Sequence, residues 1–432
     1  MERKKIWFHV DVNSAFLSWE AVWRLQHGSR RDLRDIPSVV GGNQATRHGI
    51  VLAKSIPAKK RYGVKTGEPI AAVRRRAPDL VIVPPRYDAY VDASESLVDM
   101  MRRYSPRVQR FSIDEAFLDY TGMQRCFGPP VEAAHALGQR IREELGFTVN
   151  IGVSVNKLLS KMASEFEKPD RVHTLFPGEI REKMWTLPVE ELYMVGRRTA
   201  DKLRDRGIWT IGDLARQDPA RVHSWLKGWG VTLWNFANGR YVDAERQGAA
   251  GFGGIAHGPQ EEDDAKGMGN SGTIAFDVTD ADTAHKALLA LSETVGARLR
   301  AAGRRARLIS VSFVTSDFSR FGRQHKIGHP TNATTDIFRE ATRLFDLMWQ
   351  GDPIRQLGVW SGELESQGLH QQTSLLSQSW KLELADRAVD RIRLRYGDVA
   401  VQRACFIGSE FNPMMGGTGS NRNFPAVSEG VL

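Results

Sequence analysis

Two acidic side chains stand next to each other between apolar runs, in the stretch FSIDEAFLDY at residues 111–120. Neighbouring residues on a flat strand point to opposite faces, so Asp114 and Glu115 could not share a ligand on one strand. If the chain turns here, as the tip of a hairpin, both carboxylates can point to the same side. A shared role for the two acids therefore requires a hairpin at this point of the fold.

A third acid ends another apolar run near the N-terminus. Asp11 follows residues 6–10, whose nearly continuous apolar character is typical of a buried strand. Together with Asp114 and Glu115 it would make an all-oxygen site, which suits Mg²⁺ because this ion keeps waters and binds substrate phosphates. Taken one at a time, the acids fit the simpler alternative better, a helix cap at Asp11 and a solvated turn at 114–115.

The size and charge of the chain limit its architecture and its partners. A chain of 432 residues is too long for one hydrophobic core and is expected to form about two to four domains. Its net charge of +9 and its clustered arginines favour a polyanionic partner. Cys126 and Cys405 have no metal-binding spacing, so neither a disulfide framework nor a zinc site is expected. With no secretory signal and no run of ~18 apolar residues, we expect a cytoplasmic protein.

The stretches DVNSAFLSWE at 11–20 and SIDEAFLD at 112–119 together resemble the two catalytic motifs of the Y-family DNA polymerases, low-fidelity enzymes that copy damaged templates. The resemblance extends, with interruptions, from about residue 5 to about residue 365. It implies a monomeric nucleotidyltransferase that binds primer-template DNA and adds dNTPs to the primer 3′ end. It also implies two Mg²⁺ ions, held by Asp11, Asp114, Glu115 and the carbonyl of Val12.

The order of expected elements agrees with the α+β, multidomain right-hand fold that this resemblance implies. The N-terminal part reads as β-α-β-β-α-β, the ferredoxin-like plan of a palm, with small fingers inserted after its first helix. Short helices and tight turns then indicate a helix-hairpin-helix thumb, and a second β-α-β-β-α-β set indicates an α/β little finger. The expected boundaries are palm at 1–27 and 79–173, fingers at 28–78, thumb at 174–243, linker at 244–269, little finger at 270–365 and tail at 366–432.

Four residues match, by this resemblance, positions that contact the incoming nucleotide. Phe16 matches the aromatic that stacks under the sugar and excludes a 2′-hydroxyl, although a core aromatic on an amphipathic helix is the alternative. Ala53 matches a position that roofs the templating base, and Lys161 matches a lysine that touches the triphosphate. Lys60 stands where an arginine is common, so it can supply charge but not a bidentate fork. Pro57 replaces the usual tyrosine, and solvated lysines remain the alternative.

Basic residues of the later domains are candidates for binding DNA phosphates. Gly196 lies at the expected hairpin turn of the thumb, and Arg197 and Arg198 begin the next helix, where backbone N–H groups can bind a phosphate without reading sequence. The usual first glycine of that turn is Met194 here, and an ordinary helical hairpin is the alternative. Near the strand starts of the expected little finger, five arginines could bind the DNA backbone, although each alone is more often solvated: Arg304, Arg305, Arg307, Arg320 and Arg323.

The stretch QQTSLLS at 371–377 resembles the short clamp-binding peptide of bacterial polymerases, with Gln372, Leu375 and Leu376 as its anchors. An unstructured segment is an equally good interpretation. Two other functions stay open at this point. A non-catalytic DNA- and clamp-binding adaptor on the same scaffold would typically lack palm acids, whereas this chain keeps all three. A palm-type nucleotide cyclase would need neither the thumb nor the basic C-terminal domain.

Overall fold

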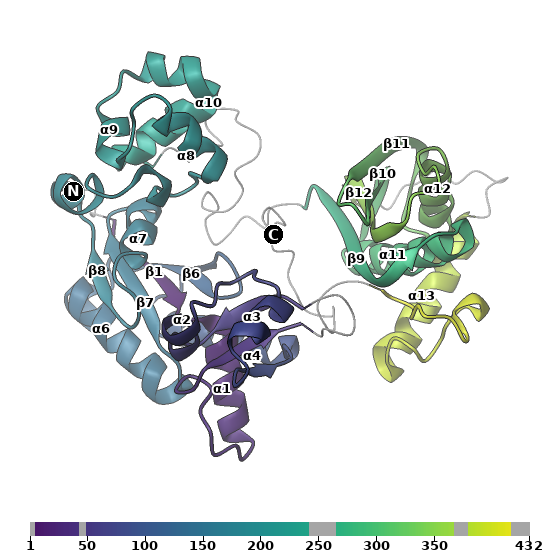
Figure 1. Cartoon of the computed structure of the whole chain (residues 1–432), viewed down its shortest axis with the longest axis horizontal. Helices are drawn as coiled ribbons and strands as arrows, with labels where there is room; N and C mark the ends of the chain where they lie inside the picture. Colours follow the sequence, from purple (N-terminus) through teal and green to yellow (C-terminus); the bar gives the residue numbers. More distant parts are fainter. Residues whose placement is uncertain (1–4, 43–48, 242–264, 367–378, 416–432) are drawn as a thin grey trace. The chain divides into compact units, whose positions relative to one another are not determined.

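A computed structural model describes residues 5–42, 49–241, 265–366 and 379–415 of the chain. The chain forms two compact units, one from Met1–Gly41 and Ile50–Asp263 and the other mainly from Asp264–Phe424 (Figure 1). Each unit has its own hydrophobic cores. Within the described ranges, no helix combines the length and the apolar character that a bilayer span requires.

A five-stranded sheet with β1 at its centre forms the palm, in the order β5-β6-β1-β7-β8. β1 is antiparallel to both of its neighbours, and its residues alternate between the two faces of the sheet. Phe8, Val10 and Val12 enter the core under helices α4 and α6. The strands are β1 Trp7–Val12, β5 Val108–Arg110, β6 Glu115–Asp119, β7 Val149–Ser154 and β8 Val172–Thr174, and the helices are α1 Ala15–Gln26, α4 Tyr87–Arg102, α5 Gln124–Phe127, α6 Pro130–Arg140 with a π-helical turn at Ile141–Leu145, and α7 Lys157–Ser164.

The fingers are a small three-stranded sheet in the order β3-β2-β4. β4 pairs in parallel with β2, so a strand expected in the second part of the palm belongs to the fingers sheet instead. The helix that follows β3 is capped by the Ser55 side chain, which accepts a hydrogen bond from the Ala58 N–H. The elements are β2 Ser38–Gly41, β3 Val51–Lys54, α2 Ile56–Tyr62, α3 Ile70–Arg76 and β4 Val81–Val83.

The thumb consists of short helices whose core continues into the palm. Leu158, Leu159 and Met162 of α7 belong to the same hydrophobic cluster as the thumb residues, so α7 joins the two domains. Met194, where the hairpin motif commonly has glycine, has a φ of 71° and therefore lies in the left-handed region. The helices are α8 Arg197–Arg204, α9 Ile211–Ala215 and α10 Pro219–Ala237, preceded by turns at Pro177–Glu179, Ile180–Met184 and Val189–Glu191.

The second unit contains the expected little finger, an antiparallel sheet in the order β11-β10-β12-β9. Helices α11 and α12 supply the apolar residues that cover one face of this sheet. The bounds of its elements are β9 Gly267–Val278, α11 Ala281–Ala301, β10 Arg304–Thr315, β11 Arg320–Thr331, α12 Thr334–Asp346 and β12 Ile354–Ser366.

Most of the expected C-terminal tail is part of this second unit. Helix α13, Ser379–Tyr396, is held to α11 by ion pairs, and a short 3-10 turn follows at Ala404–Phe406. Phe406 and Phe411 are buried in the same core as the sheet and its helices. The unit therefore extends to at least residue 415. Most of the expected linker lies outside the described residues, and its last residues, from Gly267, already form β9.

Candidate active site

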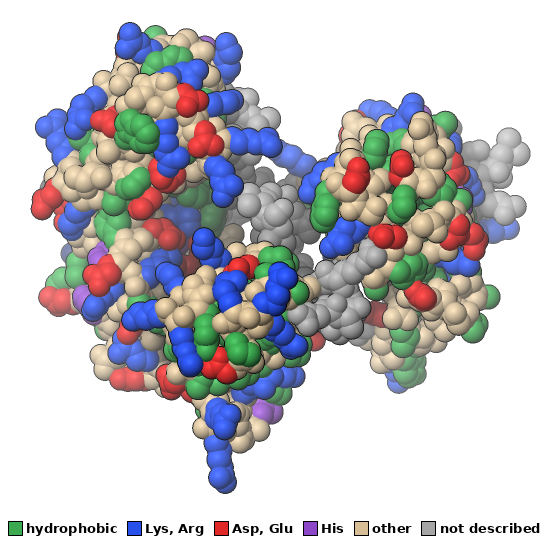
Figure 2. Space-filling model, viewed as in Figure 1, with side chains coloured by type: hydrophobic (Ala, Val, Ile, Leu, Met, Phe, Trp, Pro, Cys, Tyr) green, Lys and Arg blue, Asp and Glu red, His purple; other side chains and the backbone are tan. Residues whose placement is uncertain are grey.

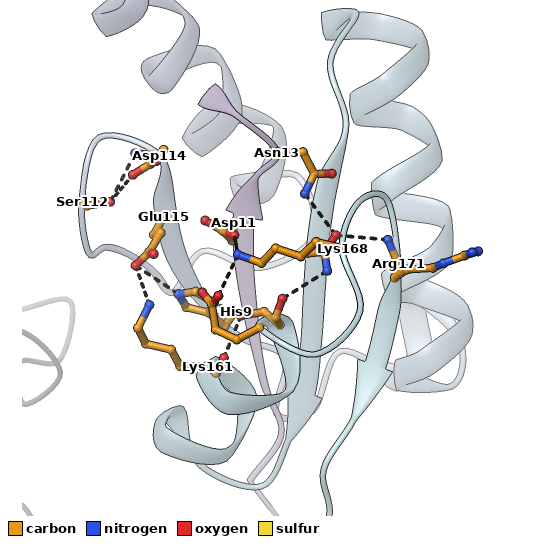
Figure 3. A network of polar contacts seen from close by, with 12 residues as sticks. His9, Asp11, Asn13, Ser112, Asp114, Glu115, Lys161, Lys168 and Arg171 are labelled. Carbon is orange, nitrogen blue, oxygen red and sulfur yellow. Dashed lines mark hydrogen bonds and ion pairs between the residues drawn. The ribbon is translucent and has the colours of Figure 1, made fainter. Parts of the chain in front are cut away.

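Strand pairing brings two of the three acids to one face of the palm sheet. Asp11 is paired with Glu115 of β6 on one side and with Asn150 of β7 on the other. Directly paired residues project to the same face, and the alternation along β1 puts His9 on that face too. Because Phe8 and Val10 occupy the core, Asp11 and His9 face α7 (Figure 3). Asp11 is almost completely buried, with 6% of its surface exposed.

The Asp114–Glu115 pair lies at a hairpin, as its sequence required. β5 ends at Arg110 and β6 begins at Glu115, so Asp114 is the last residue of the turn. The Phe111 N–H donates to the Glu115 carbonyl at 2.9 Å, and the Val12 N–H donates to the Asp114 carbonyl at 3.0 Å. These bonds fix the turn beside the end of β1. The Asp114 carboxylate accepts a hydrogen bond from the Ser112 hydroxyl at 2.6 Å.

Each of the two paired acids has a lysine of its own. Lys161 Nζ, from α7, lies 2.8 Å from Glu115 Oε2, and His9 Nε2 lies 3.5 Å from the same oxygen. Lys168, from the loop after α7, bonds to Asp11 Oδ2 and also to Glu165 Oε2 at 2.9 Å (Figure 3). The positive charges of α7 and its loop thus compensate the carboxylates of β1 and β6.

A set of three carboxylates is close enough to hold a metal ion. Asp11, Glu115 and Glu165 each offer one oxygen, and these oxygens lie within 4.8 Å of one another. A donor set made only of carboxylate oxygens fits Mg²⁺. Asp114 is not one of these three acids; it lies on the neighbouring turn, and its carboxylate accepts a hydrogen bond from Ser112. Sequence reasoning missed Glu165, which directly follows α7 four residues after Lys161, a spacing that keeps two side chains on one helical face.

Burial affects the ionisation of this site strongly. Desolvation raises the pKa of Asp11 to about 7, although the charge of Lys168 opposes the shift. Burial also raises the pKa of Asp114. Burial opposes ionisation of Glu115 as well, but the neighbouring His9 and the Lys161 ammonium outweigh it and lower its pKa to about 2. Burial lowers the pKa of His9 to about 4, so this ring is neutral at neutral pH.

Two of the nucleotide candidates lie together, and two lie apart from them. The Phe16 ring, on α1, stacks on Tyr90 with the ring centroids 5.0 Å apart. Phe16 packs against the small cluster that contains Ala53 of β3. Lys60 is exposed on α2, whereas Lys161 is buried against Glu115. The roles of these four residues stay predictions.

The candidate DNA-binding residues have different surroundings. Gly196, Arg197 and Arg198 are all exposed at the start of α8. Arg320 and Arg323 are exposed on β11, and within the part of the chain that the structure describes neither forms an ion pair. The other three little-finger arginines have partners: Arg304 donates to Ser366, Arg305 pairs with Glu383 and Arg307 pairs with Glu365.

Lysine and arginine side chains are spread over the face of both units that Figure 2 shows. The clamp-peptide candidates Gln372, Leu375 and Leu376 lie outside the described residues. DNA binding by the named arginines and clamp binding by the peptide both stay predictions.

Three segments of the chain match one protein family. Residues 10–165 match the impB/mucB/samB family, and residues 265–375 match the C-terminal domain of that family. Residues 177–208 match the HHH motif of the same family. The first match covers the three acids and helix α7, and the third covers the turn at Gly196.

Several curated proteins are similar to nearly the whole chain. It is 42% identical to a DNA polymerase IV of Clostridium acetobutylicum, over 94% of this chain and 99% of the relative. Identity to a DNA polymerase IV of Acetivibrio thermocellus is 34%, over 94% of this chain and 98% of the relative. A DNA polymerase IV 2 of Bacillus subtilis is 33% identical, over 94% and 95% of the two chains.

Solved structures share the fold. A Y-family DNA polymerase chimera superposes with a TM-score of 0.68 at 22% identity, covering 84% of this chain and 99% of the other. An insertion ternary complex of Dbh DNA polymerase gives a TM-score of 0.57 at the same identity and coverage. The expected right-hand α+β fold is thereby confirmed. The chain belongs to the impB/mucB/samB family and has the fold of the Y-family DNA polymerases.

Proposed function

We propose that this chain is a DNA-directed DNA polymerase that extends a primer 3′ end with dNTPs and copies damaged templates at low fidelity. One observation carries the proposal: Asp11 and Glu115 meet on the palm face, with Asp114 on the adjoining turn, in a chain 42% identical to a DNA polymerase IV. An adaptor that only binds DNA has no need of these buried acids.

The residues that would hold two Mg²⁺ ions are Asp11, Asp114, Glu115 and the carbonyl of Val12. When bound, the ions lower the pKa of the primer 3′-hydroxyl and neutralise charge on the leaving pyrophosphate. The burial that raises the pKa of Asp11 also makes a nearby cation favourable. Lys161 keeps Glu115 ionised and oriented. No side chain of the chain is assigned as a general base, and positioning does most of the work in such transfers.

The nucleotide would lie against the fingers. Phe16, fixed by its stacking on Tyr90, would meet the sugar and exclude a 2′-hydroxyl. Ala53, in the adjoining cluster, would roof the templating base, where little bulk leaves room for a lesion. Lys60 and Lys161 would supply positive charge for the triphosphate. The exposure of Lys60 supports its assignment, whereas Lys161 must share its charge with Glu115.

Duplex DNA would contact the thumb and the little finger through phosphates. Gly196, Arg197 and Arg198 present a helix start and two exposed basic side chains for this purpose. On the little finger, Arg320 and Arg323 are the stronger candidates, because Arg304, Arg305 and Arg307 would first have to leave their partners. The enzyme would act as a cytoplasmic monomer and reach the sliding clamp through residues 372–376.

Primer extension with Mg²⁺ on undamaged and lesion-bearing templates tests the proposal. We expect the wild type to extend the primer on both templates and Asp114→Ala to abolish the product. Asp119→Asn is the matched control, because Asp119 ends β6, the strand that follows Asp114, but pairs with Arg107 at 3.0 Å. DNA binding without extension would support the adaptor, and turnover of free nucleoside triphosphates without primer would support a cyclase.

A further inference from the structure

We propose that Lys168 is a built-in counter-cation of the acidic site, which holds Asp11 until a divalent metal ion displaces it. Lys168 would thereby set the affinity of the enzyme for metal. The inference rests on the proposed function, because it assumes that Asp11 ligates metal ions. The inference is drawn from the contacts of Lys168 and from the hydrogen bonds that fix its loop.

The Lys168 ammonium lies among the oxygens that could hold a metal. Its Nζ bonds to Asp11 Oδ2 and lies 2.9 Å from Glu165 Oε2. Asp11 and Glu165 are two of the three acids whose oxygens come within 4.8 Å of one another. Figure 3 shows the extended Lys168 side chain reaching across to Asp11. A cation therefore already occupies one oxygen of the acid that the proposed chemistry needs most.

The loop that carries Lys168 is fixed by two asparagines near Asp11, one just after β1 and one on β7. Asn13, two residues after Asp11, accepts the Asp170 N–H at 2.9 Å through its side-chain oxygen. Asn150, the β7 partner of Asp11, accepts the Arg171 N–H at 3.3 Å and donates to the Glu167 carbonyl at 2.9 Å. The side chain of Lys168 is thus delivered to Asp11 by a loop held on both sides, not by chance proximity of two surface charges.

The ammonium and a bridging metal ion compete for the same oxygen. Lys168 bonds to Oδ2 of Asp11, one of the two oxygens with which this carboxylate would ligate metal ions. A divalent ion at that oxygen would compete with the ammonium, because two cations on one carboxylate oxygen repel each other. Glu165 remains bonded to the ammonium and offers it a partner outside Asp11. Lys168 thus stabilises a buried carboxylate before metal binding, at the expense of metal affinity.

The test is a titration of the full-length protein with Mn²⁺ at about pH 8, without DNA or nucleotide, followed by electron paramagnetic resonance of free Mn²⁺. We expect Lys168→Met to lower the dissociation constant about tenfold, since a competing ion pair is lost. Lys157→Met is the matched control for loss of a nearby positive charge. Lys157 lies on α7, and its Nζ donates a hydrogen bond to the Gln109 side-chain oxygen at 2.5 Å. We expect it to change affinity less than about twofold.

Unchanged or weaker Mn²⁺ binding by Lys168→Met would overturn the inference. An equal effect of Lys157→Met would overturn it too, because the gain would then reflect general charge. If Lys168→Met does not fold, Lys168→Gln gives the same comparison with a neutral side chain of similar length.

Thermal melting provides a second readout. In EDTA, Lys168→Met should melt below the wild type, because the buried Asp11 loses its cation, and saturating Mg²⁺ should remove most of the difference. An equal decrease in melting temperature in EDTA and in Mg²⁺ would show that Lys168 stabilises the fold without affecting metal binding. Wild-type protein that fails to extend primers would reject the proposed function, whereas an active wild type with unchanged Mn²⁺ affinity in Lys168→Met would reject only this inference.

Discussion

Asp11 and Glu115 are paired across two strands, yet they ionise over different pH ranges. Asp11 is buried and Glu115 is partly buried, so desolvation opposes the charge on each. Glu115 is next to His9 and Lys161 and keeps its charge, whereas Asp11 pairs with Lys168 but also faces the carboxylates of Glu115 and Glu165. At neutral pH the site therefore contains one carboxyl that is fully ionised and one that is close to its titration midpoint.

Metal binding should depend on pH for this reason. With a pKa of about 7 for Asp11, the folded protein keeps a proton at pH 4–7 that the unfolded chain has already lost. The contribution of Asp11 to stability thus falls as pH rises through this window and is constant above it. Metal needs the ionised form, so Mg²⁺ affinity should rise roughly tenfold from pH 6 to pH 8. Isothermal titration calorimetry measures this rise, and equal affinities at both values would contradict it.

Phe16 is placed to control sugar selectivity. Its ring stacks on the buried Tyr90, and this contact fixes the position of the ring. Phe16→Ala should raise ribonucleotide over deoxyribonucleotide incorporation by about tenfold or more, because the barrier to a 2′-hydroxyl is removed. The ratio of the two kcat/KM values in single-nucleotide insertion gives the result. A ratio unchanged from wild type would reject the assignment and leave Phe16 as a packing residue.

The sequence indicated the three acids but not the groups that balance them. Adjacent acids between apolar runs predicted the hairpin at Asp114–Glu115, which the structure confirms. Lys168 could not be found in this way, because its contact with Asp11 arises from the return of a loop 157 residues later in the chain. Periodicity describes local structure, whereas such pairings depend on how separate segments pack.

At the scale of elements, helix α7 packs against the palm sheet, and Gly152 of β7 allows the helix backbone to come close to the strand. A Cβ at Gly152 of β7 would lie 1.9 Å from the Ser160 carbonyl oxygen and 2.5 Å from the Ser164 nitrogen, both in the backbone of α7. Lys161 is carried on this helix, so its contact with Glu115 depends on the close packing.

Gly152→Ala should therefore both destabilise the protein and disturb the site. We expect a loss of about 1–3 kcal/mol in unfolding free energy, since the helix must shift as a unit. Gly138→Ala in α6 is the control, because its Cβ would meet Ile151 at an ordinary 3.7 Å. A helical Gly-to-Ala change should stabilise by about 0.5–1 kcal/mol. Urea unfolding measures both variants, and similar effects of the two would contradict the packing argument.

Buried ion pairs attach helix α13 to the little finger. Glu293 of α11 is 4% exposed and accepts from Arg393 at 3.0 Å and from Arg403 at 2.9 Å. Glu293→Ala would remove the carboxylate that these two arginines share and should cost about 3–5 kcal/mol in the unfolding of the second unit. Asp282→Ala, on the same helix, breaks only an exposed pair with Lys286 and should change little. An unchanged urea midpoint for Glu293→Ala would show that α13 is not held in this way.

Element boundaries were predicted best where the pattern was strictly local. The β-α-β-β-α-β order expected for the little finger is the order found between Gly267 and Ser366, because each element has a clear period and a turn at its ends. The strand at 81–83 was expected in the palm but pairs with β2 of the fingers sheet. A short apolar run predicts a strand but does not indicate which sheet the strand joins. Residues 379–415 were expected in the tail, because the basic, amphipathic stretch that forms α13 is typical of a solvated helix as well.

At the scale of the whole molecule, the residues proposed for catalysis and some of those proposed for DNA binding belong to different units. The first carries the acids, the nucleotide candidates and the helix-hairpin-helix, and the second carries an exposed basic edge strand and the buried pairs of α13. The fold was accessible from the sequence because two motifs identify the family and the element order then follows it. The charge balance within the site was not, since it depends on contacts that only the folded chain makes.

The position of bound metal ions tests the central claim most directly. Crystals of the enzyme with primer-template DNA, a non-reactive dNTP analogue and Mn²⁺ would locate the ions by anomalous scattering. We predict two Mn²⁺ peaks, both liganded by Asp11 and joined by Asp114 and Glu115, with Lys168 released from Asp11. A map without a peak at Asp11, or with Asp114 still bonded only to Ser112, would contradict the account.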